Sequence, residues 1–190
     1  MKRPLQEFTN LSAGLYLQPD PMPDTFYLQG VHFNESGQLL PQVRPQVLAG
    51  PKIAKHLLLD GDVLFAAKGL NNFAVVFRHA DMGSKAVASS SFIVLRSKDK
   101  DQTAVTPDFL AWYLTHSPEV KAFRKQLGTT IPSISISALS TLEVPIPDMA
   151  TQERIIAIQE LRYREKILVQ TIEAKKDYLI KQQLLKSAHQ

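Results

Sequence analysis

The sequence predicts an α+β protein: a small, curved, mostly antiparallel β domain with a few helices, followed by one long C-terminal helix of the coiled-coil type. Two patterns predict this class. Short runs of β-branched and aromatic residues, such as Phe73–Phe77, alternate with turn signals over much of the chain. After Pro147, by contrast, neither proline nor glycine occurs, and residues that favour helices predominate. We therefore expect one domain over residues 1–147 and a long helix over residues 148–190.

Within the first domain, residues 1–26 contain four prolines and are expected to be irregular. Thr106 followed by Pro107 is typical of a helix N-cap and first helical position. Pro118 then divides the helical segment Asp108–Leu127 in two. Gly128, directly after this segment, is a natural helix stop. The expected strands are Tyr27–Phe33, Val43–Leu48, Asp62–Ala66, Phe73–Phe77, the end of Ala86–Leu95, and Leu142–Ile146.

The long helix carries an apolar stripe. Its members follow one another at steps of three, seven, four and seven residues, which resembles the heptad seam of a coiled coil. They are Ile158, Leu161, Leu168, Ile172 and Leu179. A helix over Met149–Lys186 is about 57 Å long at 1.5 Å per residue. We expect this stripe to pair with another helix, from a second copy or another subunit; the alternative is that the helix lies across its own domain.

Composition sets broad limits on the function. The net charge is +4, and most of the excess lies in residues 149–190, which hold 8 basic and 5 acidic residues. A mild excess of this kind is compatible with nucleic acid but does not require it. There is no cysteine, no apolar run long enough to span a membrane, and no apolar segment of signal-peptide type at the N-terminus. We expect a cytoplasmic protein.

Motifs for chemistry are weak. The only pattern of nuclease type combines Asp108 with Glu119 and Lys121, but both halves fall at predicted helix starts rather than on a strand. Asp20-Pro21-Met22-Pro23 is interpreted as a proline-rich surface loop. The histidines are scattered without the spacing of metal ligands, and no glycine-rich loop for a cofactor follows a strand. We expect no metal, no cofactor and no catalytic residue.

Several stretches, taken in order, resemble the DNA specificity subunits of type I restriction–modification systems over roughly residues 27–186. Each stretch is weak alone, and their order makes the resemblance specific. The stretches are Gly61–Phe65 (GDVLF), Ser91–Arg96 (SFIVLR), Asp108–Leu114 (DFLAWYL), Gly128–Leu139, Leu142–Pro147 (LEVPIP) and Thr151–Ile155 (TQERI).

This resemblance implies a DNA target recognition domain over residues 1–147 that reads half of a bipartite DNA sequence. The helix after it would serve as a ruler and as a docking site for methyltransferase subunits, with no catalysis by the chain itself. Most members of that family carry two recognition domains and two helices. This sequence has one of each, so the resemblance implies a half-subunit that pairs with a second copy or a second half.

We expect DNA contacts in loops rich in Lys, Arg, Asn, Ser and Thr, because these residue types bind phosphates and base edges. The expected positions are Lys68, Asn71, Asn72, Arg78, Lys85, Thr129, Thr130 and Ser133. The expected partners are double-stranded DNA, a second helix, and the methyltransferase and restriction subunits. Two alternatives are a metal-dependent nuclease and an assembly protein that uses its helix without DNA specificity.

Overall fold

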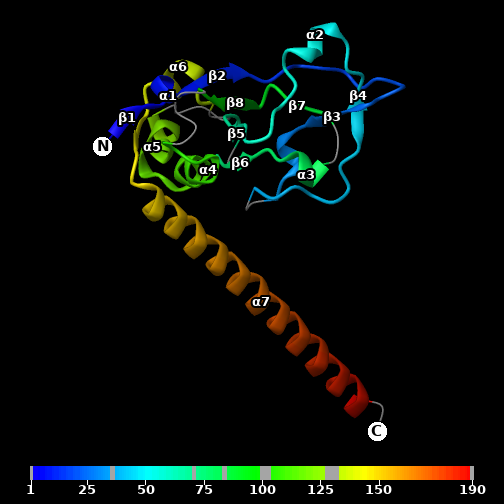
Figure 1. Cartoon of the computed structure of the whole chain (residues 1–190). Helices are drawn as coiled ribbons and strands as arrows, with labels where there is room; N and C mark the ends of the chain where they lie inside the picture. Colours follow the sequence, from blue (N-terminus) through cyan, green and yellow to red (C-terminus); the bar gives the residue numbers. More distant parts are fainter. Residues whose placement is uncertain are drawn as a thin grey trace. The chain divides into compact units, whose positions relative to one another are not determined.

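The computed structural model describes residues 2–34, 37–69, 72–82, 85–98, 104–126 and 133–188 (Figure 1). Contacts between residues divide the chain into two units, Met1–Gln152 and Glu153–Gln190. The first unit contains mixed helices and sheets, and the second is helical throughout its described residues. No helix in the described part of the chain combines the length and the apolar character that crossing a membrane requires. The α+β class with a long C-terminal helix is confirmed.

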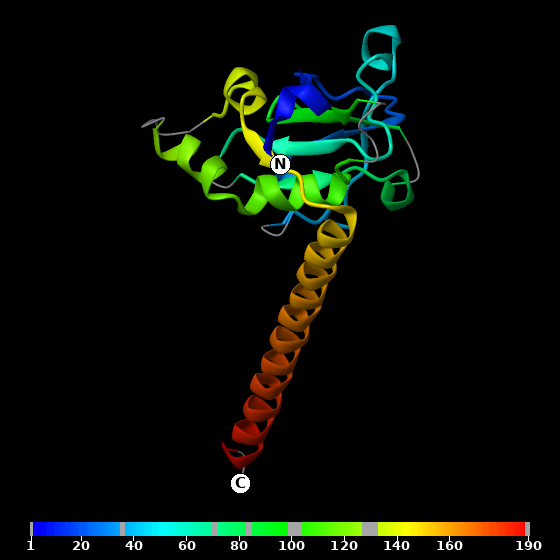
Figure 2. The same ribbon diagram turned by 60° about the vertical axis from the view of Figure 1, so that its left-hand side comes forward.

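The centre of the first unit is an antiparallel sheet of four strands in the order β2-β8-β5-β6. Its strands are β2 (Thr9–Ala13), β5 (Val63–Ala66), β6 (Ala74–Val76) and β8 (Phe92–Ser97). Every residue of β5 is buried. Helix α4 (Pro107–His116) packs along one face of this sheet, against β5 and β6 (Figure 2). Residue Thr115 fixes α4 to the sheet, because its hydroxyl accepts the N–H of Ala74 over 2.9 Å.

A three-stranded sheet, in the order β4-β3-β7, lies at one end of this unit together with α2 (Figure 1). Its β3–β7 pair is parallel, and its β3–β4 pair is antiparallel. The bounds are β3 (Thr25–Leu28), β4 (Pro45–Val47), β7 (Ala86–Ala88) and α2 (Pro51–Ala54). Leu28 of β3 shares a buried cluster with Leu64 of β5 and Phe92 of β8. The two sheets therefore have one apolar core in common.

The remaining short elements complete the first unit. Strand β1 pairs antiparallel with β9, and Val144 of β9 is fully buried. Thr106 caps α4 as predicted, because its hydroxyl accepts the N–H of Phe109. The bounds are β1 (Lys2–Pro4), α1 (Leu5–Phe8), η1 (Gly30–His32), α3 (His79–Met82), α5 (Pro118–Gln126), α6 (Ile136–Ser140) and β9 (Glu143–Pro145).

Helix α7 runs from Met149 to Ala188, and its 40 residues make it about 60 Å long. It begins where predicted: the carboxylate of Asp148 accepts the N–H of Thr151 over 2.8 Å, as an N-cap does. The first turn belongs to the first unit, in which Gln152 is completely buried.

Two local predictions are wrong. Residues 1–26 are not irregular throughout, because β1, α1 and β2 lie within them. Strand β2 has little local signal and is formed by pairing with β8, some 85 residues later in the sequence. The expected strand Tyr27–Phe33 ends at Leu28, and the segment Gly30–His32 is a 3₁₀ turn. The run Ala86–Leu95 contributes strands to both sheets, β7 and β8.

Candidate nucleic-acid interface

Lys68 and Ser133, two of the predicted DNA-contacting residues, lie side by side. They form an isolated antiparallel bridge just beyond the end of β5, although they are 65 residues apart in the sequence. The N–H of Ile134 donates to the carbonyl oxygen of Ala67 over 2.9 Å and holds this contact. Both Lys68 and Ser133 are exposed. The fold thus places an exposed ammonium group and a hydroxyl on one surface.

Asn72 extends the same surface. Its amide nitrogen donates to the carbonyl oxygen of Ala66 at 2.7 Å, which leaves the amide oxygen as an acceptor for a ligand. We call Lys68, Asn72 and Ser133 the Lys68 edge. Ser91 supports it from the start of β8, because its carbonyl oxygen accepts the N–H of Ala67 at 2.9 Å and that of Lys68 at 3.3 Å. Ammonium, amide and hydroxyl groups of this kind bind phosphates and base edges.

Arg78 and Lys85 do not join the Lys68 edge. Arg78 follows β6 at the end opposite to Asn72, where its guanidinium forms an ion pair with Asp108. Lys85 precedes β7 in the three-stranded sheet and lies 3.6 Å from a carboxylate oxygen of Asp24. Each of these cations therefore has an acidic partner within the protein. The other predicted residues, Asn71, Thr129 and Thr130, lie outside the described part of the chain.

The carboxylate of Asp24 holds several segments together. It accepts the N–H of Ala49 and the hydroxyl of Thr25, each over 2.7 Å. The Ala49 N–H, followed by the Thr25 hydroxyl and the charge of Lys85, lowers the pKa of Asp24 below its ordinary value. Asp24 therefore stays ionised, and its negative charge is directed toward groups of the protein.

The predicted apolar stripe of α7 is uncovered in the single chain. The exposed fractions of its side chains lie between 51% and 63% for Ile158, Leu161, Leu168, Ile172 and Leu179. A second stripe follows from the spacing of Ile167, Tyr178 and Leu185, which are 11 and 7 residues apart and 42%, 62% and 56% exposed. Since Ile167 precedes Leu168 in the helix, the second stripe is turned about 100° from the first. A shallow groove along this second stripe is lined by Ile167, Gln170, Thr171, Ala174, Lys175 and Tyr178.

A family model described as "Type I restriction modification DNA specificity domain" matches residues 48–176, from the end of β4 to the second half of α7. The chain belongs to this family. The resemblance inferred from the ordered stretches is thereby confirmed.

Individual relatives agree with the family. The chain is 28% identical over 111 residues to the type I restriction enzyme HindI specificity subunit of Haemophilus influenzae, across 57% of this chain and 23% of that protein. It is similar in fold to a chain from a structure of a type I R-M system, with a TM-score of 0.60, 17% identity, and coverage of 96% of this chain and 43% of that one. The S subunit from M. genitalium gives a TM-score of 0.55 at 17% identity, over 85% of this chain and 38% of that one. The chain thus spans about a quarter of the curated relative and two fifths of the solved structures.

Asp108 and Glu119, the two acidic residues of the nuclease-type pattern, take part in different local contacts. Asp108 lies at the start of α4 and pairs with Arg78. Glu119 lies beyond the other end of α4, beside Tyr113, where burial and then the Glu119 charge raise the pKa of the Tyr113 hydroxyl. Asp108 and Glu119 thus lie in different helices and have different partners. Among the described residues, no group of three His, Cys, Asp or Glu side chains is arranged to hold a metal.

Proposed function

We propose that this chain reads one half of a bipartite DNA target for a type I restriction–modification system, through the unit formed by residues 1–152. The observation that carries this proposal is the single stretch of family similarity, which runs through the Lys68 edge and onward along α7. The chain spans about two fifths of the related structures, and its long helix carries an exposed apolar stripe that suits a partner helix. The second half of the target is read by a second unit on a paired chain.

Pairing takes place along the first stripe of α7. Burying a large aliphatic side chain contributes about 1.5–3 kcal/mol, so five such residues on each of two helices supply ample driving force for association. With two identical chains packed antiparallel, the contact has two-fold symmetry and the recognition units lie at opposite ends. A helix of about 60 Å covers a little more than one and a half turns of duplex at about 34–36 Å per turn. Two copies therefore read a split, palindromic site.

The second stripe of α7 remains available after this pairing. Ile167, Tyr178 and Leu185 form an apolar row with a groove beside it, which suits a helix from another protein. We assign this row to the methyltransferase subunits, which with the restriction subunits supply the chemistry of the system. The specificity chain itself positions those subunits on DNA and uses no cofactor.

A selection experiment combined with a mass measurement tests the proposal. Light scattering on the purified chain should give a dimer, and binding to a randomised duplex library should enrich two half-sites related by symmetry and separated by a fixed spacer. A monomer that enriches no sequence would leave the proposal without support, whereas a dimer that enriches none would support the assembly alternative. Cleavage of plasmid by the chain alone with magnesium would support the nuclease alternative.

A further inference from the structure

The connection between β2 and β3 carries the two most exposed large apolar side chains of the described residues. Tyr16 is 79% exposed and Met22 is 78% exposed. Scattered apolar residues are common on protein surfaces. Here, however, two of them occupy one short connection, and the structure holds this connection in place. Apolar groups that are both exposed and fixed in position are available to a ligand.

Hydrogen bonds and prolines fix the position of Met22. Three prolines restrict the backbone of residues 19–23. The carboxylate of Asp20 accepts the N–H of Met22 over 2.9 Å. The N–H groups of Asp20 and Asp24 in turn donate to carbonyl oxygens of β4 over 2.8 and 3.0 Å. Asp20 and Asp24, which flank Met22, are thus hydrogen-bonded to β4, and Met22 is held outward between them.

Tyr16 is held outward in the same way by its neighbours. The N–H of Leu15 donates to the carbonyl oxygen of Ala88 in β7 over 2.8 Å, and the carbonyl oxygen of Leu15 accepts the hydroxyl of Tyr27 over 2.8 Å. Leu17, on the other side of Tyr16, packs inward. The side-chain N–H of the exposed Gln18 donates a hydrogen bond to the Tyr16 hydroxyl. The face of the Tyr16 ring remains open to a ligand.

Helix α2 lies on the same small core as this connection. Leu17 from the connection and Ile53 from α2 both pack against the buried cluster of Tyr27, Val47 and Val87. Tyr16 precedes Leu17 and Lys52 precedes Ile53, and both are exposed, so they border this small core; Met22 and Lys55 follow on the same two segments. We call this region the α2 face, and its members are Tyr16, Met22, Lys52 and Lys55.

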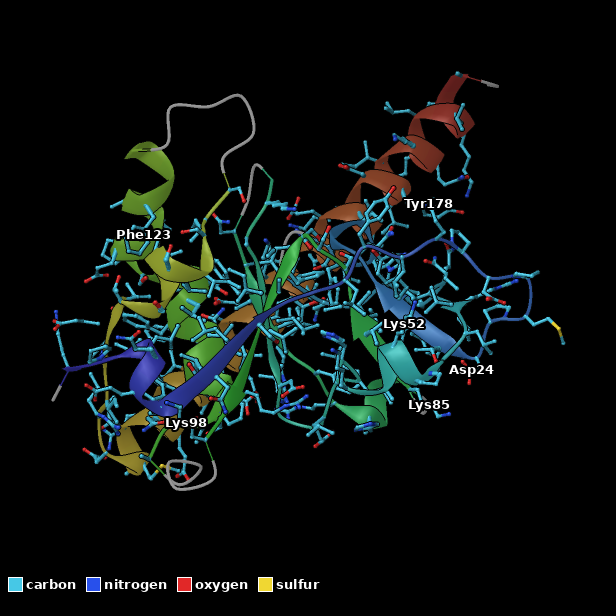
Figure 3. The ribbon with its side chains drawn as sticks, turned by 90° about the horizontal axis from the view of Figure 1, so that it is seen from above. Asp24, Lys52, Lys85, Lys98, Phe123 and Tyr178 are labelled. Atoms are coloured by element: carbon cyan, nitrogen blue, oxygen red, sulfur yellow. The ribbon has the colours of Figure 1, made fainter. Side chains whose placement is uncertain are left out.

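The α2 face is positively charged. Lys52 and Lys55 are exposed and form no ion pair with any of the residues described by the structure. Two carboxylates lie in the same region: Asp20 accepts the N–H of Met22, and Asp24 accepts the N–H of Ala49 and faces Lys85. A hydrogen bond from a neutral N–H does not cancel a carboxylate's charge, so the three lysines Lys52, Lys55 and Lys85 exceed these two carboxylates by one positive charge. Figure 3 shows Lys52, Asp24 and Lys85 gathered at one side of the unit, away from Phe123 and Lys98.

We propose that the α2 face is a second DNA-binding region, distinct from the Lys68 edge. Lys52 and Lys55 contact phosphates, while Tyr16 and Met22 contact the bases at one step of the duplex. Exposed lysines on α2, together with exposed apolar side chains on the connection, favour a polyanion with apolar base surfaces over an apolar protein partner. Proteins that bend DNA place Met, Leu, Ile, Phe or Pro against base steps in this manner, and aromatic side chains stack on bases. This inference rests on the proposed function, because it assumes that the chain binds duplex DNA.

The experiment compares four full-length variants on the duplex that the parent selects, over a range of salt concentrations. Lys52→Ala/Lys55→Ala should lower the slope of log K against log salt by about 2, one for each lost phosphate contact. Tyr16→Ala/Met22→Ala should weaken binding about tenfold with the slope unchanged, because stacking involves no counterion release. Lys121→Ala on α5 controls for the loss of one exposed cation, and Val31→Ala for the loss of an exposed apolar group.

The outcomes separate this inference from the proposed function. A parent that selects no duplex would overturn both. A parent that selects a duplex, with both double variants binding it as tightly as the controls at every salt concentration, would overturn the α2 face alone. Double variants that kept DNA binding but lost association with another subunit would likewise overturn the α2 face and leave the proposed function standing. Since all four side chains are exposed, their removal is expected to leave folding intact, which thermal unfolding verifies.

Discussion

Replacing Gln152 by alanine is expected to lower the free energy of unfolding of the first unit by about 3 kcal/mol. The Gln152 side chain is completely buried at the start of α7, and both ends of its amide are bonded. Its oxygen accepts the N–H of Thr106 at 2.9 Å and the Thr106 hydroxyl at 3.2 Å. Its nitrogen donates to the carbonyl oxygens of Ala104 and Pro147, each at 2.9 Å. One side chain thus joins the first turn of α7 to the cap of α4.

The magnitude follows from the groups that alanine would leave behind. The N–H of Thr106 and the carbonyl oxygens of Ala104 and Pro147 would each lose a partner. An unsatisfied buried polar group costs about 1–3 kcal/mol. The lower end applies here because all three residues are half-buried and water can reach them. Alanine favours a helix slightly more than glutamine does, which offsets only a few tenths of a kcal/mol.

Urea denaturation followed by tryptophan fluorescence measures this loss. The chain has a single tryptophan, Trp112, and it lies in α4, the helix whose cap Gln152 supports. Gln182→Ala on the exposed surface of α7 makes the same chemical change without removing a buried bond, and it should shift the free energy by less than about 0.5 kcal/mol. Both variants are compared at one protein concentration because association also stabilises the fold. Equal stability of the Gln152 and Gln182 variants would refute the role assigned to Gln152.

Three further expectations concern the proposed function and the fold. Lys68→Ala should weaken DNA binding and reduce the salt slope by about 1 if the ammonium group contacts phosphate; binding equal to that of the parent at every salt concentration would remove Lys68 from the interface. Leu168→Asp should convert the dimer to a monomer in light scattering, whereas Leu184→Asp, about 160° away on the helix, should not. If both variants remained dimers, pairing along the first stripe would be excluded. The Ala49 N–H lowers the pKa of Asp24 in the folded protein. The contribution of Asp24 to stability is therefore complete above its unfolded pKa of 3.8 and is lost as pH falls through its lower folded pKa. Asp24→Asn should therefore remove part of the acid-induced loss of stability, and acid unfolding curves identical to those of the parent would contradict this.

Elements with strong local signals could be predicted from the sequence. Thr106 and Pro107 mark the start of α4, and the absence of proline and glycine after Pro147 marks α7; both helices occur where expected. Strand β5, with its buried run of apolar residues, was also predicted within one residue. In each case the information lies within a few residues of the element itself. The same is true of the ordered motifs that identified the family.

Features that depend on distant parts of the chain could not be predicted. Gln152 lies between Thr151 and Glu153, so its neighbours give no sign that it is buried. Its partners are more than 40 residues earlier in the sequence, apart from Pro147. The DNA contact expected of Arg78 stays a prediction, but its ion pair with Asp108, 30 residues later in the sequence, could not be predicted from its neighbours.

The two candidate DNA-binding regions are held at a fixed separation because the sheets that carry them share one core. Leu28 of the sheet beneath the α2 face belongs to the same buried cluster as Leu64, which lies in the strand that leads to the Lys68 edge. A duplex that contacts both regions therefore requires little ordering of one relative to the other, and this favours specific binding.

Helix α7 is in the opposite situation. Between Glu153 and Ala188, all of which the structure describes, no residue is buried. A helix without tertiary packing is only marginally stable in water, even when its residues favour the helical state. Under the proposed function, its first stripe acquires packing from the α7 helix of a second chain. We therefore propose that the first unit folds and binds DNA by itself, whereas the spacing between two such units is defined by the pairing of two α7 helices. Under the proposed function, recognition of a half-site belongs to one chain and recognition of the spacer belongs to the dimer.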